Sequence, residues 1–439
     1  MATVTVRYRI SGAGSAEIAA SVEAAVADGH LVAGDPLPPV RALAADLGVA
    51  PGTVATAYAT LRDRGVVETA GRRGTRVRER STATPRWQRG AVVPPGARDL
   101  SGGGPATDLL PPLAARARGP VRYGDPDVAP RLEAAARGLL AREGVPDGPL
   151  AVVSGALDGV ERVLLAALRP GDRVAVEDPG WGNLLDLVAA LGLVADPVPV
   201  DDEGPDPAAV ERALRRGARA VLVTARAQNP TGAAVTAERA RALRAVLAAH
   251  PDALLVEDDH AAEVSGAPLH PLSGAAPRWA LVRSVSKAWG PDLRVALLTG
   301  EAALVERVRA RQRLGAGWVS RLLQDAVVDL WEDPAATALV QGAARRYAAR
   351  RGALLAALAG HGVRAHGASG LNAWLPVADE TAAVTALLAD GWGVAPGARF
   401  RLRSGPGVRV TVTGLREDEV APLAAALAAA ARGGGRTGA

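Results

Sequence analysis

The spacing of hydrophobic residues changes along the chain, and the change separates two parts. Near the amino terminus, apolar residues recur every three or four positions and predict an amphipathic helix over residues 15–28, which ends at Gly29. Two shorter helices are predicted over 41–47 and 53–64. The turn between them contains a glycine, and this arrangement is typical of a helix-turn-helix.

From about residue 120 onward, short apolar runs alternate with longer helical patterns. The runs are read as strands over residues 150–153, 174–176, 220–223, 254–256, 281–285 and 295–298. Strands that alternate with helices predict an α/β domain built on a mainly parallel sheet.

Composition divides the chain at the same place. Residues 81–118 are rich in proline, glycine and small residues, which is typical of a linker followed by an extended entry segment. We therefore expect one domain over 1–80, a linker over 81–98 and a large domain over 99–439, with a C-terminal subdomain over about 330–439.

Composition also excludes several classes of protein. The 439 residues are 49% hydrophobic and contain no cysteine, so a core is available but disulfides and thiolate zinc sites are not. The six histidines form no metal-binding pattern, and we expect no metal. No apolar run reaches the roughly 18 residues of a membrane span, and the start lacks the apolar core of a signal peptide. We expect a cytoplasmic protein without a membrane partner.

Basic residues gather after the helix-turn-helix. Residues 41–80 hold eight arginines against four acidic residues. Two short strand patterns flank the turn 71–74 and predict a β-hairpin that carries four of these arginines. An arginine-rich hairpin beside a recognition helix suits contact with DNA phosphates and grooves.

This part resembles the winged helix-turn-helix of the GntR family. The matching run extends from Gly34 to Val77 and includes G-D-x-L-P-P-x-R, T-V-x-x-A-Y and G-x-x-G-T. The resemblance implies that four residues contact double-stranded DNA: Arg41, Thr53, Arg72 and Arg73. The family often has Ser-Arg at the start of the recognition helix, whereas this chain has Ala50-Pro51. The operator sequence therefore does not follow from the resemblance.

In the large domain, chemically active side chains follow the predicted strands. Ligands gather at the carboxyl ends of strands in such sheets. The segments concerned are Ser154-Gly155-Ala156, Asp178-Pro179-Gly180-Trp181, Gln228-Asn229-Pro230-Thr231-Gly232, Glu257-Asp258-Asp259-His260 and Ser284-Val285-Ser286-Lys287. Of the 51 lysines and arginines, Lys287 is the only lysine. An arginine stays protonated and cannot form an imine, so among these side chains only Lys287 could fill that role. Taken alone, a single lysine is equally consistent with chance.

These parts suit pyridoxal phosphate (PLP). The lysine would hold it as a Schiff base, or internal aldimine, and a carboxylate would keep the pyridine nitrogen protonated. A helix start, a hydroxyl and an arginine would take the phosphate. Each segment alone has an ordinary structural explanation, and their joint order carries the prediction.

Residues 99–432 resemble fold-type I aminotransferases through E-D-P-G-W, Q-N-P-T-G, V-E-D-D and S-x-S-K. The resemblance implies helices on both faces of the sheet and a small C-terminal α+β subdomain. It makes Lys287 the Schiff-base lysine, Asp258 the pyridine partner, Asn229 the O3′ donor and Trp181 the stacking ring. It gives the phosphate to Gly155, Ala156, Ser284, Arg294 and Tyr123 of the partner subunit, and Arg409 would pair with a carboxylate. Ser286 is a further cofactor-binding residue.

Two departures from that family concern the cofactor. A tyrosine usually stands two residues after the pyridine partner, and this chain has His260 there. Histidine still donates to O3′, but its pKa makes the bond depend on pH. Ala156 has no hydroxyl where serine or threonine is common. Both changes weigh against efficient transamination more than against cofactor binding.

A GntR-type winged helix joined to an aminotransferase-like domain is the layout of MocR-type transcriptional regulators. The resemblance implies a homodimer that binds an operator and responds to PLP, to another B6 vitamer or to an amino acid that condenses with PLP. The alternative is a PLP-dependent aminotransferase with an appended winged helix, and residual transaminase activity stays open.

Overall fold

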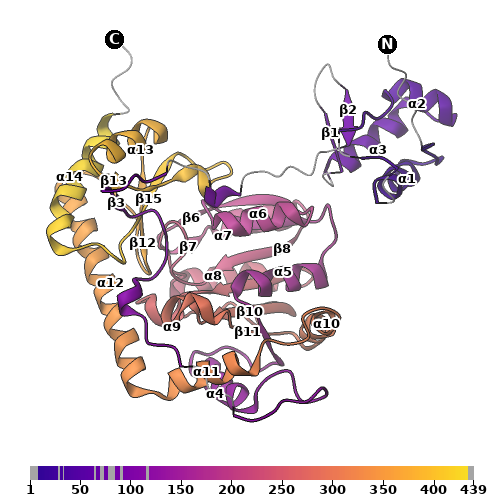
Figure 1. Ribbon diagram of the computed structural model, residues 1–439. Coiled ribbons are helices and arrows are strands. Elements are labelled where there is room, and N and C mark those ends of the chain that lie inside the picture. Colours follow the sequence, from indigo (N-terminus) through magenta and orange to yellow (C-terminus); the bar gives the residue numbers. More distant parts are fainter. Residues whose placement is uncertain are drawn as a thin grey trace. The chain divides into compact units, whose positions relative to one another are not determined.

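The computed structural model describes residues 8–27, 30–32, 34–63, 66–69, 74–77, 85–88, 92–114 and 118–433 (Figure 1). The chain divides into two compact units, and the main boundary falls between Pro85 and Arg86. No helix among the described residues is long and apolar enough to cross a membrane.

The N-terminal unit is a winged helix, as the sequence predicts. It contains α1 (Ser15–Ala27), α2 (Val40–Leu47), α3 (Pro51–Asp63) and the antiparallel pair β1 (Val67–Thr69) and β2 (Thr75–Val77). Gly48 ends α2 in a left-handed conformation, with φ of 67°, and its amide caps α2 carbonyls. The buried side chains of the three helices and two strands form one core, which includes Ile18, Leu43, Val54, Leu61 and Val77.

The large unit is built on an eight-stranded sheet with the order β4-β11-β10-β9-β8-β5-β6-β7. The strands are β4 (Leu150–Val153), β5 (Arg173–Asp178), β6 (Val194–Asp201), β7 (Gly204–Pro205), β8 (Ala218–Thr224), β9 (Leu254–Asp259), β10 (Arg278–Ser284) and β11 (Ala296–Gly300). Strands β5, β8, β9 and β10 are parallel, whereas β11 runs antiparallel to both β10 and β4. The sheet is thus mainly parallel, as predicted.

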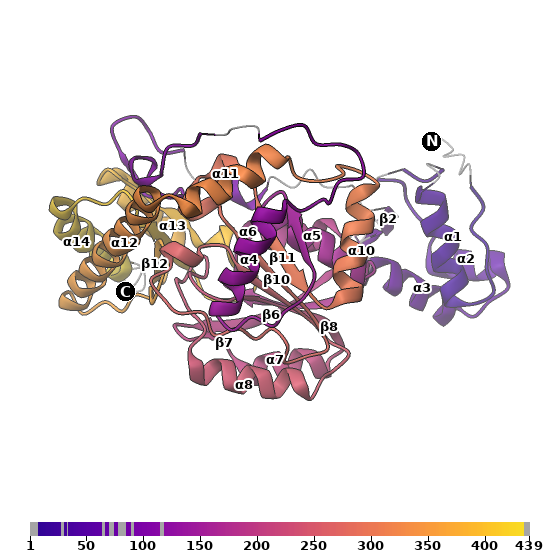
Figure 2. The ribbon, with the colours of Figure 1, turned by 90° about the horizontal axis from the view of Figure 1, so that it is seen from below.

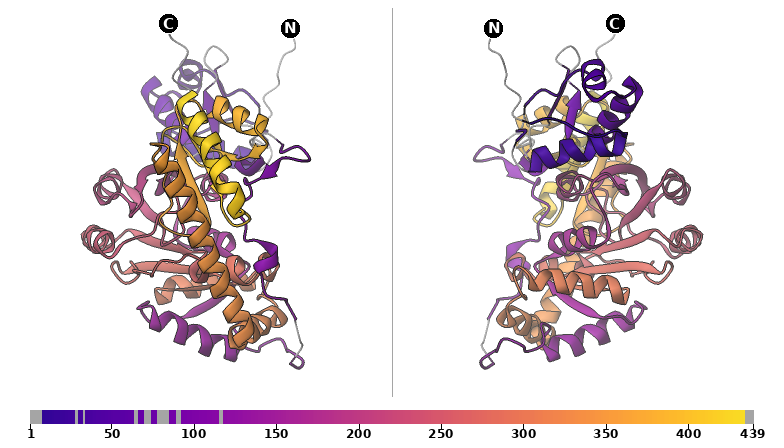
Figure 3. Two further views of the ribbon diagram at one scale, coloured as in Figure 1. Left: turned by 90° about the vertical axis from the view of Figure 1, so that its left-hand side faces the viewer. Right: turned by 90° about the vertical axis from the view of Figure 1, so that its right-hand side faces the viewer.

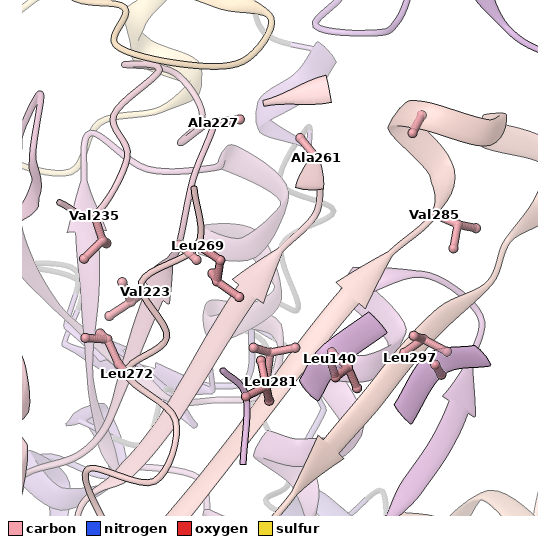
Figure 4. Close-up of a cluster of buried hydrophobic side chains, with 14 of the residues drawn as sticks. Leu140, Val223, Ala227, Val235, Ala261, Leu269, Leu272, Leu281, Val285 and Leu297 are labelled. Atoms are coloured by element: carbon pink, nitrogen blue, oxygen red, sulfur yellow. The ribbon is translucent and has the colours of Figure 1, made fainter. Parts of the chain in front are cut away.

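Helices cover both faces of this sheet (Figure 2). On one side lie α7 (Pro207–Arg215) and α8 (Ala237–Ala248), and on the other lie α5 (Ala156–Ala167) and α10 (Ala302–Arg313). Every residue of β4, β9 and β11 is buried, as expected for strands that are covered on both faces. Figure 4 shows part of the resulting core, which includes Leu140, Val223, Leu272, Leu281 and Leu297. The remaining helices are α4 (Pro130–Arg142), α6 (Gly182–Ala190), α9 (Ser286–Trp289) and α11 (Arg321–Glu332).

The C-terminal subdomain is α+β, as predicted. It follows the long helix α12 (Pro334–Gly360), and α14 (Glu417–Gly433) packs beside that helix (Figure 3). Its antiparallel sheet has the order β12 (Asn372–Pro376), β15 (Gly407–Thr411), β14 (Ala395–Pro396), and α13 (Glu380–Ala389) also packs on α14.

One early segment of the chain belongs to this subdomain. Strand β3 (Arg98–Asp99) pairs in parallel with β13 (Trp392–Gly393). The segment that follows the predicted linker is therefore held by residues from the other end of the chain. Of that linker, residues 81–84 and 89–91 lie outside the described residues, so its bounds stay a prediction.

Candidate functional site

The parallel strands bring three predicted site residues to one edge of the sheet. In the register of the sheet, Thr224 at the end of β8 lies beside Asp258 in β9, and Asp258 lies beside Val282 in β10. Asn229 follows β8, and Lys287 lies in α9 directly after β10. The carboxyl ends of three neighbouring strands thus supply an amide, a carboxylate and the single lysine.

Lys287 is a partly buried amine with a hydrogen bond to the backbone. Its Nζ atom donates to the carbonyl of Gly103 over 2.7 Å. Burial and then the charge of Arg409 lower the pKa of Lys287, Asp258 opposes both effects, and the resulting pKa is about 8. Near neutral pH a useful fraction of the amine is therefore unprotonated and nucleophilic.

Asp258 and His260 lie together beside the indole of Trp181. Oδ2 of Asp258 is 3.3 Å from Nδ1 of His260, and the rings of His260 and Trp181 stack with 6.4 Å between their centres. Asp258 is 5% exposed, and its Oδ1 atom has no hydrogen-bond partner within the described part of the chain. A buried carboxylate oxygen without a partner fits a protonated ring nitrogen.

Arg409 belongs to β15 of the C-terminal subdomain, and its side chain reaches Asn229 in the site. It is 4% exposed and donates from Nη1 to Oδ1 of Asn229 over 2.9 Å and from Nη2 to the carbonyl of Ser101. Its guanidinium lies 4.8 Å from the centre of the Phe400 ring. Burial and then the nearby charge of Arg399 lower the pKa of Arg409, Asp99 opposes them, and the resulting pKa is about 9.

Two of the predicted phosphate residues, Gly155 and Arg294, meet at the start of α5. Gly155 precedes this helix with φ of 98°, and Arg294, itself left-handed with φ of 48°, donates to the carbonyl of Ser154 over 2.7 Å. A Cβ atom on Gly155 would lie 2.5 Å from Nη2 of Arg294, so only glycine fits. The first amides of α5 have no side-chain cap, and the arrangement suits an anion.

Of the remaining predicted cofactor residues, one also lies at the start of α5 and three lie elsewhere. Ala156 is the first residue of α5, and Ser284 accepts from the amide of Ser286 over 3.2 Å. The Ser286 hydroxyl is buried without a partner among the described residues. Tyr123 is 95% exposed and packs edge-on against Trp318, so one chain alone does not bring it to the other residues.

A buried network that the sequence analysis did not assign supports Asn229 and Trp181. The Gln228 side chain donates to the carbonyl of Pro179 and to Glu177, and it accepts from the amide and hydroxyl of Thr231. It thereby ties the loop before Trp181 to the turn that contains Asn229. Burial raises the pKa of Glu177 to about 7, although three hydrogen bonds oppose the change. The motif Q-N-P-T-G contained this residue, but its partners come from distant segments.

Asp259 has a different role from its neighbour Asp258, because consecutive side chains in a strand point to opposite faces. Its carboxylate is fully buried and pairs with Arg226 and Arg283, and both arginines also reach Glu143. These cations lower the pKa of Asp259 despite burial. This cluster neutralises its own charge on the face away from Lys287.

The predicted DNA-binding residues are only partly described. Arg41 is exposed on α2, and Thr53 is partly exposed in the first turn of α3. Arg72 and Arg73 lie outside the described residues. The proposed contacts of all four residues stay predictions.

Both units match known families. Residues 106–427 match the class I and II aminotransferases, and residues 15–77 match the bacterial regulatory proteins of the GntR family. The vitamin B6 salvage pathway transcriptional repressor PtsJ of Salmonella typhimurium is 41% identical over 95% of this chain and 98% of its own. The pyridoxine biosynthesis regulator PdxR of Corynebacterium glutamicum is 35% identical over 57% of this chain and 58% of its own.

A solved structure agrees on the fold of the large unit. The α-aminoadipate aminotransferase LysN of Thermus thermophilus superposes with a TM-score of 0.66, covering 77% of this chain and 93% of that enzyme at 22% identity. The chain belongs to the MocR-type transcriptional regulators, in which a GntR-family winged helix is joined to a PLP-dependent, aminotransferase-like domain of fold type I.

Proposed function

We propose that the protein is a repressor of a vitamin B6 salvage gene and that PLP held by Lys287 is its signal. One observation carries the proposal. The only side-chain amine of the chain lies at the sheet edge beside Asp258, whose buried Oδ1 atom lacks a partner among the described residues. The likeness to a repressor of B6 salvage along 95% of the chain supports the choice of pathway.

The site residues fit the cofactor in chemistry. When bound, PLP supplies an aldehyde carbon that takes a lysine amine in a C=N bond with loss of one water, and a ring that withdraws electrons. Lys287 holds the cofactor, Asp258 faces the ring nitrogen and Trp181 covers the ring. Asn229 and His260 donate to the ring hydroxyl. Gly155, Ala156, Ser284, Arg294 and Tyr123 of the partner subunit would hold the phosphate, and Ser286 would be a further cofactor contact.

Two features favour PLP itself over an amino acid as the primary signal. Arg409, the residue that would bind an effector carboxylate, already donates to Asn229 and to the carbonyl of Ser101. His260 and Ala156 depart from the aminotransferase pattern at two cofactor contacts. We assign Arg409 to the carboxylate of a secondary amino-acid effector.

The winged helix binds the operator as part of a homodimer in the cytoplasm. Arg41, Thr53, Arg72 and Arg73 contact the DNA, and two half-sites are read together, which raises affinity without new contacts. The winged helix over 1–80 is joined to the large domain over 99–439 by the linker over 81–98. The extreme exposure of Tyr123 supports a site that is completed by a second subunit.

The test measures binding of the full-length protein to duplex DNA from upstream of a vitamin B6 salvage gene, with and without PLP. PLP should change the affinity for this DNA by about 5- to 150-fold in the wild type. In Lys287→Ala, PLP should leave the affinity unchanged. Borohydride reduction and peptide mapping should place the pyridoxyl group on Lys287, with the amino terminus as the competing amine. An affinity that ignores PLP, or that responds equally in Lys287→Ala, would refute the proposal. Transaminase assays on the same samples test the enzyme alternative.

A further inference from the structure

Two side chains of the candidate site end on the backbone of one short segment. This segment, Ser101-Gly102-Gly103-Gly104, is called the glycine strap below. Lys287 donates to the carbonyl of Gly103 over 2.7 Å, and Arg409 donates to the carbonyl of Ser101. The cofactor lysine and the carboxylate arginine therefore share the strap as a hydrogen-bond partner.

The other side of the strap is held by the C-terminal subdomain. The Gly103 amide donates to the hydroxyl of Thr411 over 2.9 Å, and the hydroxyl of Thr413 donates to the carbonyl of Gly104 over 2.8 Å. Just before the strap, the carbonyl of Leu100 accepts from the amide of Thr411. The strap thus lies between the lysine after β10 and the residues at the end of β15.

Glycine is required at one position of the strap but not at its neighbour. Gly103 has φ of 72°, and a Cβ atom there would lie 2.8–3.0 Å from three atoms of the Arg409 guanidinium. An added Cβ on Gly102 meets no atom within 4 Å, and its φ lies outside the left-handed region. The close approach of the strap to Arg409 therefore depends on Gly103.

We infer that the glycine strap relays the occupancy of the cofactor site to the linker of the winged helix. An Nζ atom that is bonded to the cofactor no longer donates to Gly103, and a carboxylate bound by Arg409 would compete with Ser101. Either event removes one of the two side-chain contacts between strap and site. The strap follows β3, which begins at Arg98, where the predicted linker ends. Both ligands thus bias one element that continues along the chain toward the DNA-binding unit.

The inference rests on the proposed function and is tested on the full-length protein by backbone hydrogen exchange. Peptides that cover residues 98–106 should exchange about threefold faster or more with PLP than without it, because one hydrogen bond is lost. In Lys287→Met the same peptides should exchange fast without PLP, and adding PLP should not change their exchange rate. Unchanged exchange on adding PLP to the wild type would overturn the inference.

A pair of glycine variants links the strap to DNA binding. Gly103→Ala should loosen the strap without PLP and reduce the PLP-dependent shift in DNA affinity at least about threefold. Gly102→Ala, the matched control, should keep both properties. Equal exchange rates and equal PLP-dependent affinity shifts in the two variants would overturn the inference. If Gly103→Ala fails to fold, the Lys287→Met variant decides the question. A strap that exchanges as slowly in Lys287→Met as in the wild type would then overturn the inference.

The two proposals fail in different ways. If PLP shifts the DNA affinity of the wild type but the strap does not respond, the relay is wrong and the proposed function stands. If PLP leaves the DNA affinity unchanged, the proposed function is wrong, whatever the strap does.

Discussion

The lowered pKa of Lys287 predicts how fast the protein captures PLP at each pH. Only the neutral amine attacks an aldehyde, and burial together with Arg409 brings the pKa of Lys287 to about 8. At pH 7 about one amine in eleven is then neutral, against about one in 3,000 for a lysine with the ordinary pKa. The site thus gains roughly 300-fold in reactive amine. The capture rate should rise about tenfold per pH unit below pH 7 and level off above about pH 9.

Arg409→Met is the perturbation that tests the electrostatic part of this reasoning. Removing a neighbouring positive charge makes the protonated lysine easier to form, so the pKa of Lys287 should rise. A rise of about one pH unit would slow capture at pH 7 nearly tenfold while leaving the rate on the alkaline plateau almost unchanged. Arg307→Met, on the exposed side of α10, removes the same charge at a position that is not a predicted site residue and should behave as the wild type.

The assay is stopped-flow absorbance of the apo protein mixed with PLP between pH 6 and 10. PLP has its own titrations, but these are the same for all three proteins and cancel in the comparison. Peptide mapping after borohydride reduction separates Lys287 from the amino terminus. A wild-type midpoint near pH 10, or equal midpoints in the wild type and Arg409→Met, would refute the reasoning.

Three further predictions concern stability. Gln228→Leu removes four hydrogen bonds from a buried network, and urea denaturation should show a loss of about 3–4 kcal/mol; a loss below about 1 kcal/mol would contradict the network. Glu177 and Glu257 keep their protons in the fold to about pH 7, whereas the unfolded chain releases them near pH 4.5. The free energy of unfolding should therefore fall between pH 5 and 7, by up to about 3 kcal/mol per group. Thermal denaturation measures this fall, and a Glu257→Gln protein whose stability falls as steeply with pH as that of the wild type would argue against it. Tyr58→Phe removes a 2.8 Å hydrogen bond to the carbonyl of Pro38. Hydrogen exchange in α3 should then report a loss of about 1 kcal/mol of stability, and unchanged exchange would show that the bond does not stabilise the winged helix.

The sequence predicted the sheet edge well because the relevant rule is local. A polar residue at the end of an apolar run lies at the carboxyl edge of a parallel sheet, and this placed Asn229, Asp258 and Lys287 together. The direction of β11 was beyond this rule. Its neighbours are buried on both faces, so their apolar runs look alike whichever way a strand runs.

Contacts between distant segments could not be predicted from the sequence. Gly103 and Lys287 are 184 residues apart, and nothing in Ser-Gly-Gly-Gly distinguishes a hydrogen-bonded strap from part of a linker. The sequence motif Q-N-P-T-G likewise did not show that Gln228 contacts Glu177 and Pro179. Such partners depend on how segments far apart in the sequence pack together, which no local spacing encodes.

The single lysine also affects how closely the response of the protein follows the concentration of PLP. PLP reacts with exposed amines of many proteins, and each such adduct removes cofactor without producing a response. Here all the lysine and arginine side chains except Lys287 are arginines, which remain protonated and do not condense with an aldehyde. Apart from the amino terminus, each chain can therefore take up one PLP as an imine, at the position that we propose as the signalling site. The occupancy of this site and the total amount of PLP bound to the protein are then nearly the same quantity. The response therefore follows the free PLP concentration, because no PLP is bound at positions that produce no response.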